Sequence, residues 1–124
     1  MIAVDGAQFD FPCSIRRTAR ILSSDVSGML MNNIEFNDVL ATYYDYSVKI
    51  VVPVQDMSRY YTFFEAVSAP VSSHVFTFPY NGETIDVTAK VESISDVYYR
   101  EVDGVRVWRD IQIEIHAIEP SKEA

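Results

Sequence analysis

The side chains of this sequence that are best suited to chemistry are one cysteine, Cys13, and two histidines, His74 and His116. A cysteine nucleophile needs a neighbouring base and a group that orients it, and the residues around Cys13 indicate neither. Cys13 follows Pro12 in an apolar stretch, so we interpret it as a small buried hydrophobic residue. Because it is the sole cysteine, we expect no internal disulfide.

The histidines do not fall into a metal-binding or catalytic pattern. The sequence contains no His-x-x-x-His, no His-Glu-x-x-His, no paired cysteines and no glycine-rich phosphate loop. We interpret His74 as a half-buried structural histidine and expect His116 to point outward on the last strand. Acidic residues are frequent, but Asp25 and Asp38 form a pair only if the fold brings them together. We therefore predict no catalytic residue, no metal site and no cofactor, and we do not expect an enzyme.

A candidate binding surface follows from the dipeptide Asp103-Gly104. Asp-Gly is typical of a two-residue hairpin turn, and such a turn determines which residues of its two strands face each other. In this register Glu101 faces Arg106 and Tyr99 faces Trp108, on the face away from the alternating isoleucines that follow. Tryptophan, tyrosine and arginine are enriched at interface hot spots. The predicted interface residues are therefore Tyr99, Glu101, Arg106 and Trp108.

Three interpretations of this surface stay open. The ring pair can be a cross-strand contact that stiffens the hairpin by under about 1 kcal/mol. It can be covered by another part of the same chain, or it can anchor a partner. The assignment depends on register, because a single β-bulge would move one ring to the other face.

Turn dipeptides and alternating polarity predict the strands that position these residues. Three dipeptides that tolerate the positive φ angles of hairpin turns lie between apolar runs. They are Asp5-Gly6, Asn81-Gly82 and Asp103-Gly104. Residues 43–52, 85–91 and 111–116 alternate between apolar and polar side chains, which is the period of half-buried strands. The predicted core residues are Val48, Ile50, Phe64, Phe76, Phe78, Val87, Ile111, Ile113 and Ile115.

One helix is predicted at about 57–68, with Asp56 as its N-cap and Pro70 preventing its continuation. Its apolar stripe, which we expect to cover one sheet, consists of Met57, Tyr60, Tyr61, Phe64 and Val67. The segment 22–33 has no clear period. We interpret it either as the start of a strand or as a flap that orders on a partner.

Composition and charge indicate a single soluble β-rich domain that spans residues 1–124. The chain is 48% hydrophobic, which is enough for a real core, and its formal net charge is −8. Such a charge disfavours nucleic-acid partners and anionic membranes. No apolar run has the length of a membrane span, and the first five residues carry no basic residue, so we expect no secretory signal.

Several stretches occur together in a familiar order. They are VDGAQFDFP at 4–12 followed by IRR at 15–17, APVSSHVFTFPY at 69–80, DGVRVWRDI at 103–111 and IEP at 118–120. The set resembles small structural proteins encoded among the tail genes of siphophages and prophages of Gram-positive bacteria, over nearly the whole chain. The resemblance implies a place in the virion tail, or in the bacterial cytoplasm during assembly. It implies no catalytic residues.

We predict a mainly β fold, an antiparallel β-sandwich or partly open barrel with one flanking α-helix at about 57–68. The first functional hypothesis is a phage or prophage tail structural or assembly protein. It would form a homo-oligomer or bind other phage tail proteins through protein–protein contacts. The alternative is a carbohydrate- or ligand-binding β module that uses Tyr99, Trp108 and nearby tyrosines as a platform, and an enzyme is the third hypothesis.

Overall fold

The structure is a computed structural model, and it describes residues 2–23 and 39–123. Most of the segment 22–33, which includes Asp25, lies outside these residues. Asp38 also lies outside them. The strands in chain order are β1 (Ile2–Val4), β2 (Ala7–Phe9), β3 (Cys13–Ser23), β4 (Val39–Ile50), β5 (His74–Tyr80), β6 (Glu83–Val102), β7 (Val105–Ala117) and β8 (Lys122–Glu123). Between β4 and β5 lie a short 3-10 turn, η2 (Val54–Asp56), and the helix α1 (Met57–Val67). Within the described residues, the predicted mainly β fold with one α-helix is confirmed.

All three predicted hairpin turns are present. Asp5, Asn81 and Asp103 have φ angles of 50°, 46° and 50°, in the left-handed region that Asp and Asn tolerate better than most residues. Each turn joins two strands that pair immediately beside it, because the residues before and after each dipeptide are ladder partners. The local sequence therefore determined these three hairpins.

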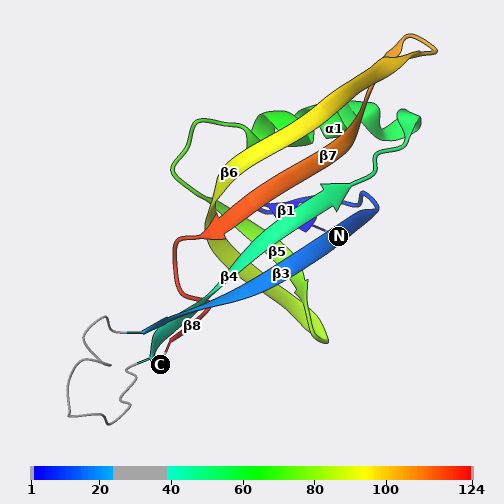
Figure 1. The fold of residues 1–124 in the computed structure, drawn as a ribbon. Helices are drawn as coiled ribbons and strands as arrows, with labels where there is room; N and C mark the ends of the chain where they lie inside the picture. Colours follow the sequence, from blue (N-terminus) through cyan, green and yellow to red (C-terminus); the bar gives the residue numbers. More distant parts are fainter. Residues whose placement is uncertain (1, 24–38, 124) are drawn as a thin grey trace, which may run out of the picture.

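The strands form one antiparallel sheet in the order β2-β1-β5-β6-β7-β4-β3, with β8 paired to β4. The sheet is curled, so that β4 and β5 face each other across the core (Figure 1). The rings of Tyr46 on β4 and Phe78 on β5 stack with centroids 3.9 Å apart, although the two strands are not neighbours in the sheet. This arrangement is a partly open barrel whose two edges are β2 and β3.

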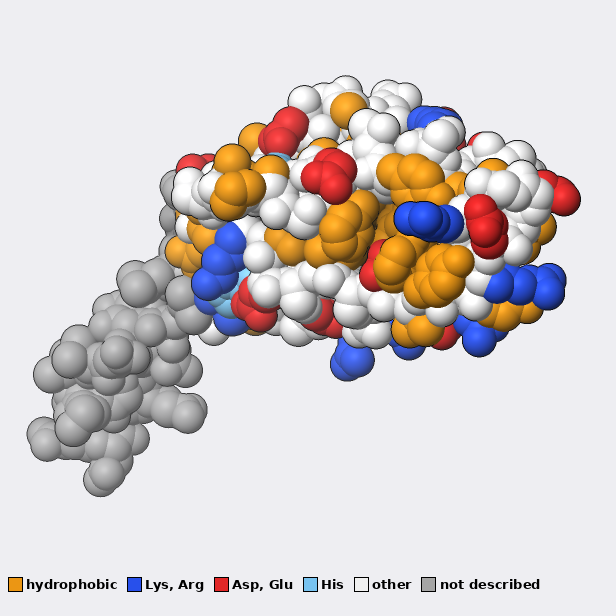
Figure 2. Space-filling model, turned by 90° about the horizontal axis from the view of Figure 1, so that it is seen from above, with side chains coloured by type: hydrophobic (Ala, Val, Ile, Leu, Met, Phe, Trp, Pro, Cys, Tyr) orange, Lys and Arg blue, Asp and Glu red, His pale blue; other side chains and the backbone are white. Residues whose placement is uncertain are grey.

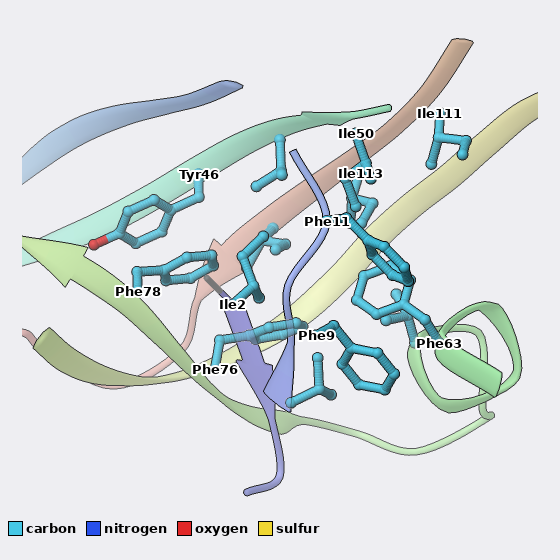
Figure 3. Packing of buried hydrophobic residues seen from close by; sticks show 14 of the residues in the cluster. Ile2, Phe9, Phe11, Tyr46, Ile50, Phe63, Phe76, Phe78, Ile111 and Ile113 are labelled. Carbon is cyan, nitrogen blue, oxygen red and sulfur yellow. The ribbon is translucent and has the colours of Figure 1, made fainter. Parts of the chain in front are cut away.

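The core is a single cluster of apolar side chains from both halves of the curled sheet and from α1 (Figure 3). Of the predicted core residues, eight are buried: Val48, Ile50, Phe76, Phe78, Val87, Ile111, Ile113 and Ile115. Phe64 is only half-buried, and Phe63 takes its place in the core. The reason is the segment around β2, because Phe9 and Phe11 pack edge-on against the ring of Phe63 at 4.9 and 5.8 Å.

The helix begins and ends close to the predicted residues. Asp56 occupies the N-cap position, but its side chain makes no capping hydrogen bond. Instead, Asp56 closes the preceding 3-10 turn, and its backbone N–H donates to the carbonyl of Pro53 at 2.9 Å. At the other end both the backbone N–H and the hydroxyl of Ser68 donate to the carbonyl of Phe64. The predicted cap residue is therefore in place without acting as a side-chain cap.

Candidate functional site

The ends of β6 and β7 form a two-stranded arm, residues 97–109, that extends beyond the other strands (Figure 1). β5 pairs with β6 only up to residue 89, and β4 pairs with β7 only over residues 111–115. Among the described strands, the arm therefore pairs only with itself, and both of its outer edges have free backbone groups. Such edges are templates for pairing with another chain.

The register of the arm differs from the prediction at one point. Glu101 faces Arg106 as predicted, but Trp108 pairs with Tyr98 and not with Tyr99. The ladder shifts between Tyr98 and Arg100, so that Tyr99 is an extra residue on β6. The cause is a β-bulge, which inserts one residue on one strand and reverses the side on which the preceding residues lie.

The bulge leaves Tyr99 on the surface between two cations. The guanidinium groups of Arg100 and Arg109 lie 4.9 and 4.2 Å from the centroid of its ring. Val97, Tyr98 and Tyr99 are 49%, 47% and 43% exposed, which makes them three consecutive large apolar residues on the surface. Exposed apolar patches with charged surroundings mark interaction sites more often than single exposed residues do.

The predicted register placed Trp108 on an open face, but in the structure it does not lie there. It is half-buried, packs against the core cluster and meets the ring of Tyr98 edge-on at 5.3 Å. A second irregularity explains this position, because the ladder also shifts between Ser95 and Val97 and the opposing Asp110 has a φ of 53°. Two of the three open interpretations therefore apply to Trp108. It is covered by other parts of the chain, and it forms a cross-strand ring pair with Tyr98.

Trp108 lines an aromatic pocket of about 280 Å³ between α1 and the base of the arm. We use the name aromatic pocket for the residues Tyr60, Tyr61, Phe64, Glu65, Asp96 and Trp108. The hydroxyl of Tyr60 donates a hydrogen bond of 2.5 Å to Oδ2 of Asp96. Burial, together with this bond to Asp96, raises the pKa of Tyr60 well above its ordinary value, so the phenol keeps its proton.

The helix also holds the arm from the side. The hydroxyl of Tyr61 donates to the backbone carbonyl of Arg106, on the arm strand opposite Glu101. Seen from the side where β6 and α1 lie, hydrophobic side chains gather with basic and acidic side chains between them (Figure 2). The arm, its buttressing helix and the aromatic pocket thus form one continuous candidate surface.

The two histidines lie far from this surface. His74 was predicted to be half-buried and is fully buried; it pairs with Ala89, and its Nδ1 lies 2.7 Å from Oδ2 of Asp5. The hydrogen bond to His74, aided by the Val75 N–H at 2.8 Å, lowers the pKa of Asp5 below its ordinary value. The pair joins the first turn of the chain to the start of β5 and serves a structural role.

His116 points outward, as predicted, and belongs to a polar network on the outer face of the sheet. Nε of Arg20 donates to Oδ2 of Asp45 at 3.1 Å, and its Nη2 lies 3.2 Å from Nε2 of His116. Nδ1 of His116 lies 3.5 Å from Asp45 and 3.4 Å from Glu92. The network links the edge strand β3 to β4, β7 and β6, which explains these charges without a ligand.

Cys13 is half-buried in β3 and packs against the core cluster. Within residues 2–23 and 39–123, no group of three or more His, Cys, Asp or Glu side chains is placed to hold a metal ion. None of the helices described is long and apolar enough to cross a membrane.

Sequence reasoning missed most of the aromatic pocket. Tyr60, Tyr61 and Phe64 were recognised only as a core stripe, and Asp96 was not singled out. One signal was present in the strand pattern, because Asp96 lies two residues from both Ile94 and Tyr98 and shares their side of β6. A half-buried carboxylate on the same side of a strand as the partly buried Ile94 is the kind of residue that needs a specific partner.

Comparison with known proteins identified no match for this chain. No protein-family model, no curated protein and no solved structure matches it.

Proposed function

We propose that this protein is a structural or assembly component of a siphophage or prophage tail. It acts through protein–protein contacts, with copies of itself or with a neighbouring tail protein. Its place of action is the virion tail, or the bacterial cytoplasm while the tail is assembled. The ordered sequence resemblance over residues 4–120 supports the tail assignment, and the arm supports the contact-forming role.

The single observation that carries the proposal is the arm with its free edges and exposed rings. A two-stranded ribbon that pairs with nothing else is marginally stable in water by itself. Here α1 supports it from one side, through the Tyr61 hydroxyl and the packing of Trp108. A ribbon held out in this way presents backbone donors and acceptors to a partner strand.

The charge on the arm fits a role in association. The chain as a whole carries −8, and like-charged copies repel one another. Residues 97–109 contain three arginines and two acidic residues, so this part of the surface is locally basic. A locally basic contact surface on an acidic protein reduces repulsion where copies or acidic neighbours meet.

Sedimentation velocity of the purified protein over a range of concentrations tests the proposal. We expect a defined oligomer, and we expect Tyr99→Ala to weaken self-association by about 2 kcal/mol or more, as at interface hot spots. Thermal unfolding of Tyr99→Ala should match the wild type, because Tyr99 is exposed and lies outside the ladder.

Val71→Ser is the matched control, since Val71 is an exposed apolar residue remote from the arm in the sequence and outside every strand. A wild-type monomer at all concentrations that also fails to bind the neighbouring tail proteins would contradict the proposal. So would a gene neighbourhood without tape-measure and tail genes.

A ligand-binding β module is the second candidate, and the aromatic pocket is the observation that favours it. The platform predicted from Tyr99 and Trp108 is not formed, because these rings are not ladder partners. Tyr98 and Trp108 meet edge-on with an angle of 64° between their planes, which leaves no flat two-ring surface for a sugar. Titration with methyl glycosides, followed by tryptophan fluorescence, separates this candidate from the first.

A further inference from the structure

The aromatic pocket offers more free hydrogen-bond acceptors than free donors. The hydroxyl proton of Tyr60 is committed to Asp96, and that of Tyr61 to the carbonyl of Arg106. Among the pocket side chains this leaves the indole N–H of Trp108 as the single donor not engaged in the described structure. The acceptors are the second oxygen of Asp96, the carboxylate of Glu65 and the faces of the rings.

Asp96 is a half-buried carboxylate without a cation. It makes no salt bridge within the described residues, and its one hydrogen bond there comes from the neutral phenol of Tyr60. Of the three arginines of the arm, Arg100 and Arg109 stack on Tyr99, and Arg106 makes no salt bridge with Asp96 within the described residues. A carboxylate removed from water is stabilised when a cation pairs with it and donates hydrogen bonds to its oxygens.

The ladder is irregular opposite Asp96, where two residues of β7, Asp110 and Ile111, oppose this single residue of β6. Asp96 lies between Ser95 and Val97, where the register of β6 against β7 shifts. On the opposing strand Asp110 adopts a left-handed φ of 53°. Bulges of this kind re-aim a side chain and are frequent beside functional sites.

We propose that the aromatic pocket binds a cationic side chain, an arginine in preference to a lysine, presented by a partner protein. A guanidinium plane stacks on an aromatic ring and donates to a carboxylate at the same time, whereas an ammonium group is a point charge. The carboxylates of Asp96 and Glu65 give the pocket itself a negative lining, which suits a basic side chain of a partner. The inference deepens the proposed function and rests on it for the claim that a protein carries the cation.

The chain provides its own reporter, because Trp108 is its only tryptophan and lines the pocket. Its indole N–H gives one resonance in a proton–nitrogen correlation spectrum. We expect N-acetyl-arginine amide to shift this resonance saturably, with an affinity in the millimolar range expected for one side chain. The uncharged isostere N-acetyl-citrulline amide should bind about fivefold or more weakly.

Asp96→Asn keeps an acceptor for Tyr60 but removes the charge, so it should fold and lose about fivefold or more in affinity for the arginine probe. The matched control is Asp86→Asn on the same strand, an exposed residue that accepts a hydrogen bond from Thr77 and should leave the affinity unchanged. If Asp96→Asn does not fold, Glu65→Gln decides, because Glu65 is exposed on α1 and its loss should weaken binding at least twofold.

Four results overturn the inference. They are the absence of a saturable shift, equal binding of the arginine and citrulline probes, unchanged affinity in the deciding variant, and binding of methyl glycosides in place of the arginine probe. The probe titration reports on the pocket alone, and sedimentation of Tyr99→Ala reports on the arm. The failure of one is therefore distinguishable from the failure of the other.

Discussion

Ile113 lies at the centre of the core, 1% exposed, and its ladder partners are Val48 on β4 and Ile94 on β6. Truncation to alanine removes buried methyl groups and leaves a cavity that the rigid sheet cannot collapse. We expect Ile113→Ala to lower the free energy of unfolding by about 2–5 kcal/mol in urea titrations. Ile21→Ala is the matched control, because Ile21 on the edge strand is 64% exposed and its truncation should stay within about 0.5 kcal/mol.

Asp5 couples the free energy of unfolding to pH through its contact with His74. The hydrogen bonds from His74 and from the Val75 N–H lower the pKa of Asp5 below its ordinary value of 3.8. The stabilisation is therefore present above that value and disappears as the pH falls through the lowered pKa. Asp5→Asn tolerates the same positive φ, so it tests the charge without disturbing the turn.

We expect Asp5→Asn to lose under about 1 kcal/mol of stability at neutral pH, because the carboxylate is half-exposed. The difference from the wild type should vanish in acid, where both side chains are uncharged. Unfolding free energies measured from pH 7 to pH 2 check this. A difference that stays constant over the whole range would mean that the effect does not come from the charge of Asp5.

At the scale of the element, the arm depends on the backbone of its turn. Gly104 has a φ of +79°, where a side chain is strained, whereas Gly82 in the corresponding turn of β5 and β6 does not have a positive φ. A Cβ atom would meet no neighbour at either glycine, so only the backbone conformation differs. Gly104→Ala should therefore destabilise the protein by about 1–2 kcal/mol.

Gly82→Ala is the matched control, and it should be near neutral or slightly stabilising. Thermal unfolding measures both variants. Hydrogen exchange localises the effect, since amides of the arm should lose protection in Gly104→Ala before those of the core strands do. Equal losses in the two variants would show that the strain at the arm turn is not the cause.

At the scale of the whole molecule, closure of the curled sheet depends on contacts between strands that are not neighbours. Tyr46 stacks on Phe78, but its buried hydroxyl has no hydrogen-bond partner within the described residues, and burial raises its pKa. Tyr44 also reaches across, and its hydroxyl lies 3.3 Å from that of Tyr80.

These two tyrosines make a matched pair of tests. Tyr46→Phe keeps the stacked ring and removes a polar atom that bonds to nothing described, so stability should be unchanged or rise by up to about 1 kcal/mol. Tyr44→Phe removes one partner of a hydrogen bond between the two halves and should cost about 0.5–1.5 kcal/mol. Denaturant unfolding gives both values, and the opposite order would contradict the assignment of the two hydroxyls.

Features that depend on neighbours along the chain could be predicted from the sequence alone. Positive φ at Asp5, Asn81 and Asp103 is a property of the residues at the turn, and each turn sets the register next to it. The alternation through Ile111 and Ile113 separated core from surface, because strand side chains point to opposite faces. The helix was likewise predicted from its spacing and from the proline beyond it.

Which residues of the candidate site come together depends on contacts between distant segments, and the sequence pattern did not reveal it. The bulge at Tyr99 on β6 and the bulge opposite Asp96 on β7 are small backbone changes that reverse side-chain directions, and no local dipeptide signals them. The choice of Phe63 over Phe64 for the core depended on where the N-terminal hairpin packs. The aromatic pocket joins a helix to a strand some thirty residues away, and such contacts follow from packing of the whole chain, not from the pattern of any one segment.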